Sequence, residues 1–555
     1  MATDRIGQFQ YRRFAPAMPA LRPDGHELAR HAVLIVGGGP VGLSLALGLA
    51  RRGIRSVVFE ADDAVCEGSR AACISRRSLE ILDRLGVAQA FVDKGLAWTR
   101  GRSYYGTDEV LVFDMPSQPG DKFPPMINLE QFYSEQFLLD AIDAINAHAP
   151  GMVDIRWAST VDALQRRPDG VTLGVANALG RYESSGDWLL ATDGGQSFVR
   201  NSLGLELHGT AYQGRYAIVD IELHSSYPTE RRAWFDPPWA RGTTILMHRQ
   251  PDDLWRVDFQ LAAGQDAAQV LSPEQVRLFV QTHLDAIGEG HLSWTPVWSS
   301  IYRAGAMTLD AYRHGRILFA GNAAHAMPIF GVRGLNSGFD DGDNLCWKLA
   351  AVIQGQGGDA LLDSYDTERL QAFHENAANA MRSTEFMSPP NRGFELMREA
   401  ALSLAVRHRG IARLVNPRQT QAIHYVNSPL STPSSGFAHG PEAGAPLIDA
   451  PVRDGMHLTD LLARDGGFTA LVFGDPAGSD ALAGSLRAGN QGGMPCHCVS
   501  LPLDDDADTG SRLATLYDAR PGTVYLVRPD GHVCGRWHTP DAATVRHALR
   551  VACCQ

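Results

Sequence analysis

Residues 31–60 read HAVLIVGGGPVGLSLALGLARRGIRSVVFE, and this stretch decides the fold of the chain. The apolar run at 32–36 predicts a buried strand, and the glycines that follow it directly lead into a helical pattern. A second apolar run at 56–59 predicts the next strand. The stretch therefore predicts a strand, a tight turn, a helix and a second strand, as at the start of an α/β domain.

The glycine loop between strand and helix has the spacing of a dinucleotide-binding turn. Gly37 permits the tight turn, Gly39 lets the backbone approach a pyrophosphate, and Gly42 lets helix and strand pack closely. Pro40 suits a first helical turn, and the free N–H groups around Pro40 and Val41 face an anion. The loop alone does not distinguish FAD from NAD(P).

Glu60 completes the dinucleotide-binding pattern. It lies about 20 residues beyond the glycines, where a carboxylate accepts hydrogen bonds from ribose hydroxyls. A flexible turn is the alternative explanation for glycines of this kind, but strand, loop, helix, second strand and acidic end occur here in the right order. We therefore predict a dinucleotide site.

Composition limits the classes of function. The 555-residue chain is longer than one hydrophobic core, so we expect two or three domains. Its formal net charge of -12 argues against a nucleic-acid partner, which needs a basic surface. No apolar run approaches the roughly 20 residues of a membrane span, and residues 1–30 lack the apolar core of a secretory signal. We therefore expect a cytoplasmic protein without a membrane partner.

The eight cysteines do not form a metal or redox motif. No CxxC occurs, and residues 496–498 and 553–554 lack the paired spacing of a structural zinc site. We therefore expect free thiols and no metal.

Strand patterns interrupt the α/β frame. Residues 129–143 predict an amphipathic helix, whereas residues 152–191 and 211–262 predict short strands separated by turns. Aromatic residues of the second strand region offer a wall for a flat apolar ligand, with core packing as the alternative explanation. These are Trp234, Trp255 and Phe259.

Residues 315–350 carry the second strong signal, in which a buried strand feeds a polar turn, a glycine loop and a helix N-terminus. The Asp-Gly pair at 193–194 is by itself a turn signal. Taken together with the first glycine loop and residues 315–350, however, it gives a combination of motifs that resembles the FAD-dependent aromatic hydroxylases. That family of single-component monooxygenases includes phenol and 3-(3-hydroxyphenyl)propionate hydroxylases. The resemblance covers roughly residues 30–450.

The resemblance implies a role for each segment. The first glycine loop binds the ADP half of FAD, residues 193–200 serve both FAD and NAD(P)H, and residues 321–336 hold ribitol and isoalloxazine. Beyond the glycine loop and Glu60, the implied FAD residues are Arg70, Gln131, Asp193, Gly194, Asn322, Pro328, Gly331, Gly334, Leu335 and Asn336.

Two positions depart from the family pattern. Asn322 replaces the usual Asp, so it can bond ribitol without carrying charge. Arg333 stands in the segment 332–334, where the family usually has Gly-Gln-Gly. Three hypotheses for Arg333 stay open: it stabilises negative charge at flavin N1 and C2=O, it binds a substrate carboxylate, or it lies on the surface.

A phenolic substrate needs a proton acceptor. We select His248, which ends a strand pattern in the expected substrate sheet and belongs to the residue type that titrates near neutral pH. Tyr104 and Tyr105 are alternatives, and a purely structural histidine is the more common case.

The expected fold class is α/β, with a Rossmann-like FAD-binding domain, an inserted mixed or antiparallel substrate sheet, and a C-terminal domain that resembles the thioredoxin-like domain of phenol hydroxylases. Lacking CxxC, that last domain cannot exchange dithiols, so we expect a structural role. The expected boundaries are 1–30, a surface arm; 31–110, 131–210 and 311–427, FAD-binding; 111–130 and 211–310, substrate-binding; 428–450, a linker; and 451–555, the thioredoxin-like domain.

Family chemistry implies an NAD(P)H-dependent monooxygenase that hydroxylates a phenolic ring with O₂ through a C4a-hydroperoxyflavin, and a homodimer. The alternatives are an NAD(P)-dependent dehydrogenase using the N-terminal unit alone, a flavin oxidoreductase without oxygen insertion, and a flavin-binding interaction protein.

Overall fold

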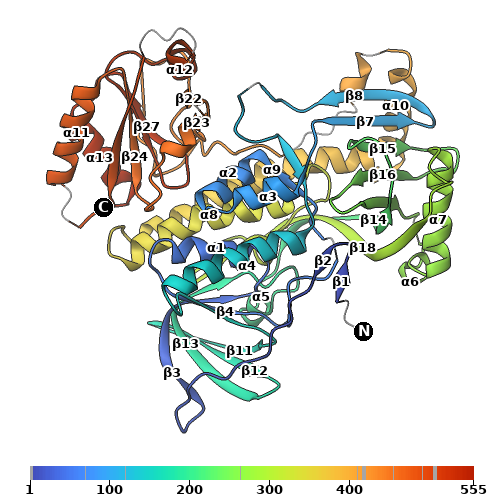
Figure 1. Cartoon of the computed structure of the whole chain (residues 1–555), viewed down its shortest axis with the longest axis horizontal. Coiled ribbons are helices and arrows are strands. Elements are labelled where there is room, and N and C mark those ends of the chain that lie inside the picture. The colour runs from blue at the N-terminus through green and yellow to red at the C-terminus, as the bar shows by residue number, and fades with distance from the viewer. Residues whose placement is uncertain are drawn as a thin grey trace.

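The protein is described from a computed structural model. The structure describes residues 4–68, 70–118, 120–262, 264–408, 410–414, 420–453, 455–489, 492–503 and 509–555. Figure 1 shows three regions grouped around the long helices α8 (Gly334–Ile353) and α9 (Ala360–Met387): a sheet near β3, a second sheet near β14 and the C-terminal region in red.

The first sheet contains the expected dinucleotide-binding unit. Its order is β10-β4-β3-β13-β12-β11, and β20 also pairs with β13. The parallel strands are β10 (Val153–Arg156), β4 (Ser56–Phe59), β3 (His26–Val36), β13 (Gly180–Ala191) and β20 (Ile317–Phe319). The antiparallel strands are β11 (Thr160–Arg167), β12 (Gly170–Asn177) and β19 (Arg313–His314). Helix α1 (Pro40–Ala50) packs against α8 and against α4 (Gln131–His148).

The second sheet is mostly antiparallel and has the order β21-β18-β14-β17-β16-β15-β7-β8. Its strands are β21 (His325–Ala326), β18 (Trp294–Thr308), β14 (His208–Leu223), β17 (Leu254–Gln260), β16 (Thr244–Arg249), β15 (Arg231–Phe235), β7 (Arg100–Tyr105) and β8 (Asp108–Asp114). Both β7 and β8 belong to this sheet, so the chain enters it at Arg100, earlier than the expected boundary at 111. Strand β7 pairs with β15, more than 120 residues away, and such a long-range pairing leaves no local signal in the sequence.

Helix α7 (Pro273–Ala286) covers one face of the second sheet. Its apolar side packs with Trp234, Trp255 and Phe259 in one core cluster. The expectation that these aromatic residues wall a ligand site is therefore wrong, because core packing accounts for them.

The N-terminal segment is more than a surface arm. Strands β1 (Arg5–Ile6) and β2 (Phe9–Gln10) form a hairpin, and the buried Phe9 ring lies 4.6 Å from the ring of Phe132 in α4. Strand β3 also begins inside this segment, at His26. The expectation failed because strands of two residues leave no periodic signal.

The C-terminal region is a four-stranded sheet with helices. Its order is β25 (Cys496–Leu501), β24 (Phe468–Phe473), β26 (Thr523–Val527) and β27 (Val533–Trp537). Strands β24 and β25 pair in parallel, whereas β24 with β26 and β26 with β27 pair antiparallel. The helices are α11 (Pro476–Gly489), α12 (Thr509–Tyr517) and α13 (Ala542–Ala552). The segment before this region, expected as a linker, packs on it: Thr432 N–H donates to Cys534 O at 2.8 Å.

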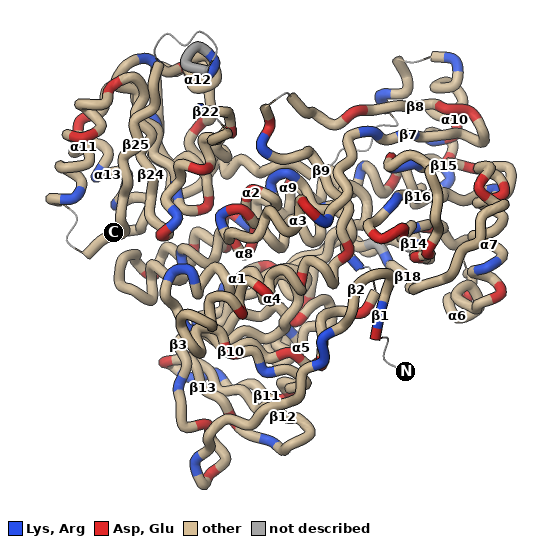
Figure 2. Tube along the Cα trace, viewed as in Figure 1, with Lys and Arg blue, Asp and Glu red and all other residues tan. Residues whose placement is uncertain are grey.

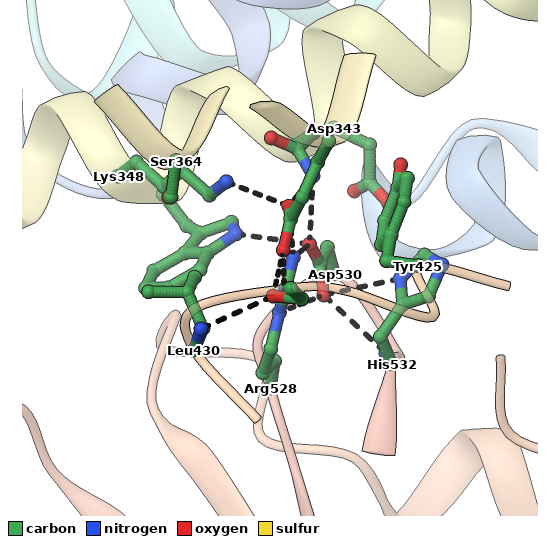
Figure 3. Close-up of polar contacts among 12 residues, drawn as sticks. Asp343, Lys348, Ser364, Tyr425, Leu430, Arg528, Asp530 and His532 are labelled. Carbon is green, nitrogen blue, oxygen red and sulfur yellow. Dashed lines mark hydrogen bonds and ion pairs between the residues drawn. The ribbon is translucent and has the colours of Figure 1, made fainter. Parts of the chain in front are cut away.

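Buried charges attach the C-terminal region to the central helices, as Figure 3 shows around Arg528 and Asp530. Arg528 Nη1 donates to Glu368 Oε1 of α9 at 2.5 Å, and Lys348 Nζ of α8 donates to Glu368 Oε2 at 2.7 Å. Trp347 Nε1 donates to Asp530 Oδ2 at 3.1 Å. Because these groups are shielded from water, the contact fixes how the two regions meet.

Short elements complete the chain. They are β5 (Cys73–Ser75), β6 (Leu96–Ala97), β9 (Met126–Asn128), β22 (Pro451–Arg453), β23 (Met456–His457), α2 (Arg76–Arg84), α3 (Ala88–Lys94), α5 (Phe198–Ser202), α6 (Ala267–Val270) and α10 (Arg392–Ala405). Figure 2 shows acidic and basic residues interspersed along all three regions. Within the described ranges no helix combines the length and the apolar character that crossing a membrane requires.

Candidate functional site

A cavity of about 1230 Å³ joins the two sheets. Its walls come from the glycine loop after β3, the inner face of the second sheet and residues 320–336. This volume exceeds the roughly 300–1,000 Å³ of ordinary small-molecule pockets, so the cavity has room for a large cofactor together with a second ligand.

The glycine loop has the geometry that its sequence predicts. Gly37 has φ 103°, and a Cβ there would lie 2.5 Å from Thr192 O. A Cβ on Gly42 would collide with Gly37 O, so only glycine lets α1 approach the strand this closely. Gly39 is the N-cap of α1, Pro40 follows it, and both line the cavity. A Cβ on Gly39 would meet nothing nearer than 4.0 Å, so the space above this backbone is open to a ligand.

Glu60 is held at the end of β4 by backbone donors. Its Oε2 accepts from Gly38 N–H at 2.6 Å and its Oε1 accepts from Asp62 N–H at 2.9 Å. Burial raises the pKa of Glu60, and the backbone hydrogen bonds oppose that rise. The carboxylate lines the cavity at the distance along the chain that a ribose contact requires.

The edge of the cavity near α4 holds Arg70, Gln131 and a residue that sequence reasoning missed, Glu135. Gln131 Oε1 accepts from Ala71 N–H at 3.2 Å, and its Nε2 donates to Glu135 Oε1 at 2.8 Å. Glu135 Oε2 accepts from Cys66 N–H at 2.6 Å, and burial raises the pKa of Glu135 to about 7. The signal available was its position four residues after Gln131, on the same helix face.

The Asp-Gly pair after β13 is more than a turn. Asp193 Oδ1 accepts from Ser197 Oγ at 2.6 Å and Oδ2 accepts from Val199 N–H at 3.0 Å, so its carboxylate organises the start of α5. Gly194 has φ 77°, and both Asp193 and Gly194 line the cavity.

The second glycine segment surrounds the other end of the cavity. Asn322, Pro328, Gly334 and Leu335 line it, whereas Gly331 does not. Gly331 instead turns the chain with φ 89°, and its carbonyl accepts from Thr420 N–H at 2.9 Å.

Asn336 also lines the cavity, but protein groups use both ends of its amide. Its Nδ2 donates to Cys73 O at 3.1 Å and to Val332 O at 2.7 Å, while its Oδ1 accepts from Ser75 N–H at 2.9 Å and from Ser78 Oγ at 2.6 Å. Asn336 therefore ties the loop before α8 to β5 and α2.

Asp341 was missed by the sequence reading, although it supports this whole end of the site. The wholly buried carboxylate accepts from Gly321 N–H at 2.9 Å and from Arg369 Nε at 2.6 Å, and it lies 2.7 Å from His325 Nε2. Burial opposes its ionisation, but Arg369 and His325 lower the pKa of Asp341 to about 2. Its only sequence signal was an acidic residue within an otherwise buried helix pattern.

Arg333 is buried at the start of α8 and lines the cavity, so the surface hypothesis is wrong. Its Nε donates to Asn376 Oδ1 at 3.2 Å and its Nη1 donates to Gly331 O at 3.2 Å. Burial lowers the pKa of Arg333 to about 10, which leaves it charged at pH 7. Val332 before it has φ 59°, a strained value for a β-branched residue that a glycine would adopt freely.

His248 lies in the cavity wall, and neither ring nitrogen has a hydrogen-bond partner among the described residues. Burial, Arg231 and Arg256 lower its pKa well below the ordinary value. The expectation that His248 titrates near neutral pH is therefore wrong, because burial and two nearby guanidiniums disfavour imidazolium. Tyr104 and Tyr105, the alternative acceptors, are not among the described residues that line the cavity. In the described part of the chain, no group of three or more His, Cys, Asp or Glu is arranged to hold a metal ion.

A family model described as an FAD binding domain matches residues 30–380, well over half of the chain, so the chain belongs to this FAD-binding family. The 6-methylpretetramide 4-monooxygenase of Streptomyces rimosus is 27% identical over 533 residues, with 93% of each chain covered. The 3-(3-hydroxy-phenyl)propionate/3-hydroxycinnamic acid hydroxylase of Mycolicibacterium smegmatis is 27% identical over 527 residues, covering 91% of this chain and 90% of that protein. The resemblance to FAD-dependent aromatic hydroxylases is confirmed.

Solved structures share the fold. The flavin-dependent monooxygenase PieE, solved with FAD and substrate, superposes with a TM-score of 0.77 at 22% identity, covering 95% of this chain and 98% of that one. Aklavinone-11 hydroxylase, solved with FAD and aklavinone, gives 0.75 at 22% identity, covering 95% and 100%. The cavity fits FAD on its own evidence, because the open backbone at Gly39 and the helix N-termini of α1 and α8 offer N–H donors at separate points along it.

Proposed function

We propose that the protein is an NAD(P)H-dependent FAD monooxygenase that adds one oxygen atom of O₂ to a phenolic ring. The observation that carries this proposal is the single cavity that joins a dinucleotide-binding loop to the polar inner face of a separate sheet. FAD, when bound, supplies the chemistry by which NAD(P)H and O₂ are used.

The residues at the first glycine loop hold the ADP half of FAD in this proposal. The N–H groups at the start of α1 meet the pyrophosphate, and Glu60 accepts from ribose hydroxyls. Arg70 and Gln131 close the edge of the site, and Asp193 and Gly194 form its floor.

The residues around α8 hold the ribitol and isoalloxazine. Asn322 faces the cavity for ribitol, while Pro328, Leu335 and the N–H groups near Gly334 surround the ring. Arg333 places a buried positive charge at this end, which favours negative charge on the pyrimidine edge of the ring.

The second sheet receives the aromatic substrate opposite this end. Its inner face lies inside the molecule, so a bound ring is shielded from water while it reacts. His248 is neutral and can accept a hydrogen bond from a substrate hydroxyl, but it does not store a proton at neutral pH.

A substrate screen tests the proposal. NADH and NADPH oxidation is measured over a panel of phenols and hydroxy-aromatic acids, with product mass and hydrogen peroxide determined for each. A product heavier by one oxygen atom, with little peroxide, supports hydroxylation. NAD(P)H oxidation that yields only peroxide with every phenol contradicts it and favours an oxidoreductase without oxygen insertion.

The C-terminal region is proposed to be a thioredoxin-like domain with a structural role. Its sheet combines one parallel and two antiparallel pairings, and its described cysteines are free thiols. Without CxxC it has no dithiol to exchange. A homodimer and a cytoplasmic location stay predictions.

A further inference from the structure

Five polar side chains form a row across the cavity face of the second sheet. Asp220 of β14 stands opposite Arg256 of β17, and Arg256 stands opposite His248 of β16. Arg231 is the first residue of β15. Because Arg232 pairs with Met247 and the two strands are antiparallel, Arg231 lies level with His248 and continues the row. Asp258 lies two residues after Arg256 and therefore projects from the same face. Apart from Asp220, all of these line the cavity.

Protein groups supply hydrogen-bond partners for only some of the polar atoms in this row. Arg256 Nε donates to Asp220 Oδ1 at 3.0 Å, and its Nη1 donates to Arg70 O at 3.0 Å. In contrast, Asp258 Oδ1 and Arg231 Nη1 are buried without a hydrogen-bond partner among the described residues, as are both nitrogens of His248. Leaving a buried polar atom unpaired is costly, so a wall that carries an open acceptor and an open donor on one face is built to meet a ligand.

The charges of the row distinguish Asp258 from His248 as a proton acceptor. Arg231 and Arg256 both disfavour imidazolium at His248, whereas both favour the carboxylate of Asp258. Burial raises the pKa of Asp258 to about 6, which leaves the group ionised at neutral pH and able to take a proton. The other charged or titratable groups that interact with this row include Asp220 and Tyr216 on β14, Cys73 on β5 and Glu130 before α4.

The row also lies on the side of the cavity that meets the flavin-binding loop. Cys73 lines the cavity, and its carbonyl accepts from Asn336 Nδ2 at the start of α8. The thiol of Cys73 is close enough to Arg231, Arg256 and Asp258 for their charges to shift its pKa. A ring that touches the row therefore also approaches the loop before α8.

We propose that Asp258 accepts the proton of a substrate phenol while Arg231 binds a second, carbonyl or carboxylate, oxygen of the same molecule. This inference rests on the proposed function and names the substrate class: aromatic phenols that carry a second oxygen acceptor. In the step, the phenol O–H bond breaks, its proton bonds to the Asp258 carboxylate, and the electron pair stays on the substrate as phenolate. His248 is a neutral hydrogen-bonding neighbour.

The test uses the FAD-loaded protein and three matched probes: 6-hydroxy-2-naphthoate, 2-naphthol and 2-naphthoate. Binding is measured by calorimetry, and ionisation of the bound naphthol by its difference absorbance across pH. We expect the wild type to bind the hydroxynaphthoate about 10-fold or more tightly than either probe that lacks one group. We also expect naphtholate to appear in the complex below the pH at which the free probe ionises.

Three variants assign the roles. Asp258→Asn should abolish the early ionisation and the preference for the hydroxyl group, and Arg231→Gln should abolish only the preference for the carboxylate. His248→Asn should keep the ionisation profile. FAD content and Tm confirm that each variant is folded, and Asp258→Glu should restore part of the ionisation if an asparagine variant is unstable.

Two results overturn the inference. One is a wild type that binds the hydroxynaphthoate no better than the single-group probes. The other is early ionisation that survives Asp258→Asn and disappears in His248→Asn. These measurements need neither NAD(P)H nor O₂, so they test this inference separately from the proposed function. Hydroxylation by the wild type, with unaltered probe binding in the variants, contradicts only the inference. The expected probe binding without hydroxylation contradicts only the proposed function.

Discussion

Glu368 of α9 and Arg528 after β26 form a two-pronged ion pair, with N–O distances of 2.5 and 2.9 Å, and neither side chain is exposed to solvent. Burial opposes the charge on Glu368, but Arg528 and Lys348 hold its pKa well below the ordinary value. Figure 3 shows Arg528 reaching from the C-terminal region toward the central helices. Lys348 of α8 donates to the same carboxylate at 2.7 Å, so this pair also holds α8, the helix that begins at the cavity wall.

Removing this charge should destabilise the whole protein. Glu368→Gln removes the negative charge that balances the buried positive charges of Arg528 and Lys348. Breaking a buried ion pair in this way typically lowers the free energy of unfolding by about 3–5 kcal/mol. Urea unfolding of the FAD-loaded protein measures the effect. Arg100→Gln, which removes an exposed pair with Asp114, is the control and should leave the midpoint unchanged. Equal midpoints for both variants would show that the buried pair contributes no net stability.

Glu60→Ala should weaken FAD binding. The change removes the proposed ribose acceptor and leaves Gly38 N–H without its partner, and a buried unpaired group costs about 1–3 kcal/mol, or roughly 5–150-fold in Kd. Fluorescence titration of the apoprotein with FAD gives the Kd. Glu67→Ala, which alters an exposed carboxylate nearby, is the control. An unchanged Kd in Glu60→Ala removes the ribose assignment.

FAD affinity should fall as pH rises through about 7 because of Glu135. This carboxyl lies beside the open backbone at Gly39, and burial raises its pKa to about 7. The protonated form tolerates a pyrophosphate nearby, while the ionised form repels it, so binding takes up a proton. Glu135→Gln should flatten the dependence of Kd on pH between 6 and 8. The same slope in both proteins would place the titrating group elsewhere.

Asp341→Asn should cost stability that depends on pH. The folded pKa of about 2 is below the unfolded value near 3.9, so ionised Asp341 contributes stability above pH 4, and the contribution is lost as pH falls toward 2. Its size at pH 7 is on the order of 2–3 kcal/mol. Unfolding midpoints of wild type and variant should therefore converge on acidification. A constant gap down to pH 2 would contradict the assigned ion pairs with Arg369 and His325.

The sequence was sufficient to predict those elements whose structure depends on residues close together in the chain. The strand–glycine–helix unit from β3 to β4 was predictable because its pattern is local: a Cβ on Gly42 would collide with the carbonyl oxygen of Gly37, five residues earlier. In the C-terminal region, the apolar runs at 470–473 and 524–527 likewise coincide with strands β24 and β26. In both cases the residues that determine the structure are close together in the chain.

The features that could not be predicted from the sequence depend on contacts between residues far apart in the chain. Asp341 matters because it meets Gly321, Arg369 and His325, and no periodicity reports such convergence. His248 was misjudged for the same reason, since its low pKa depends on burial in the folded sheet and on Arg231 and Arg256 from neighbouring strands. The pairing of β7 with β15 likewise joins segments that only the folded sheet brings together.

Arg333→Gln restores the family's usual residue and should separate the two remaining hypotheses for this position. The guanidinium is buried at the start of α8, next to the proposed flavin ring, and its pKa of about 10 keeps it charged at pH 7. If it stabilises the reduced flavin, the variant should have a lower flavin reduction potential and slower reduction with every substrate. If it binds a substrate carboxylate, KM should rise only for carboxylated substrates.

Structural damage has to be distinguished from either role, because Arg333 Nε and Nη1 also donate to Asn376 and to the Gly331 carbonyl. Asn376→Ala is the matched control: it removes one of these hydrogen bonds and keeps the charge. A potential that falls in Arg333→Gln and stays at the wild-type value in Asn376→Ala assigns the effect to the charge. Equal shifts in both variants assign it to the packing of the loop. Wild-type potential, reduction rate and KM in Arg333→Gln would contradict both roles and leave Arg333 as a support for the strained turn at Val332.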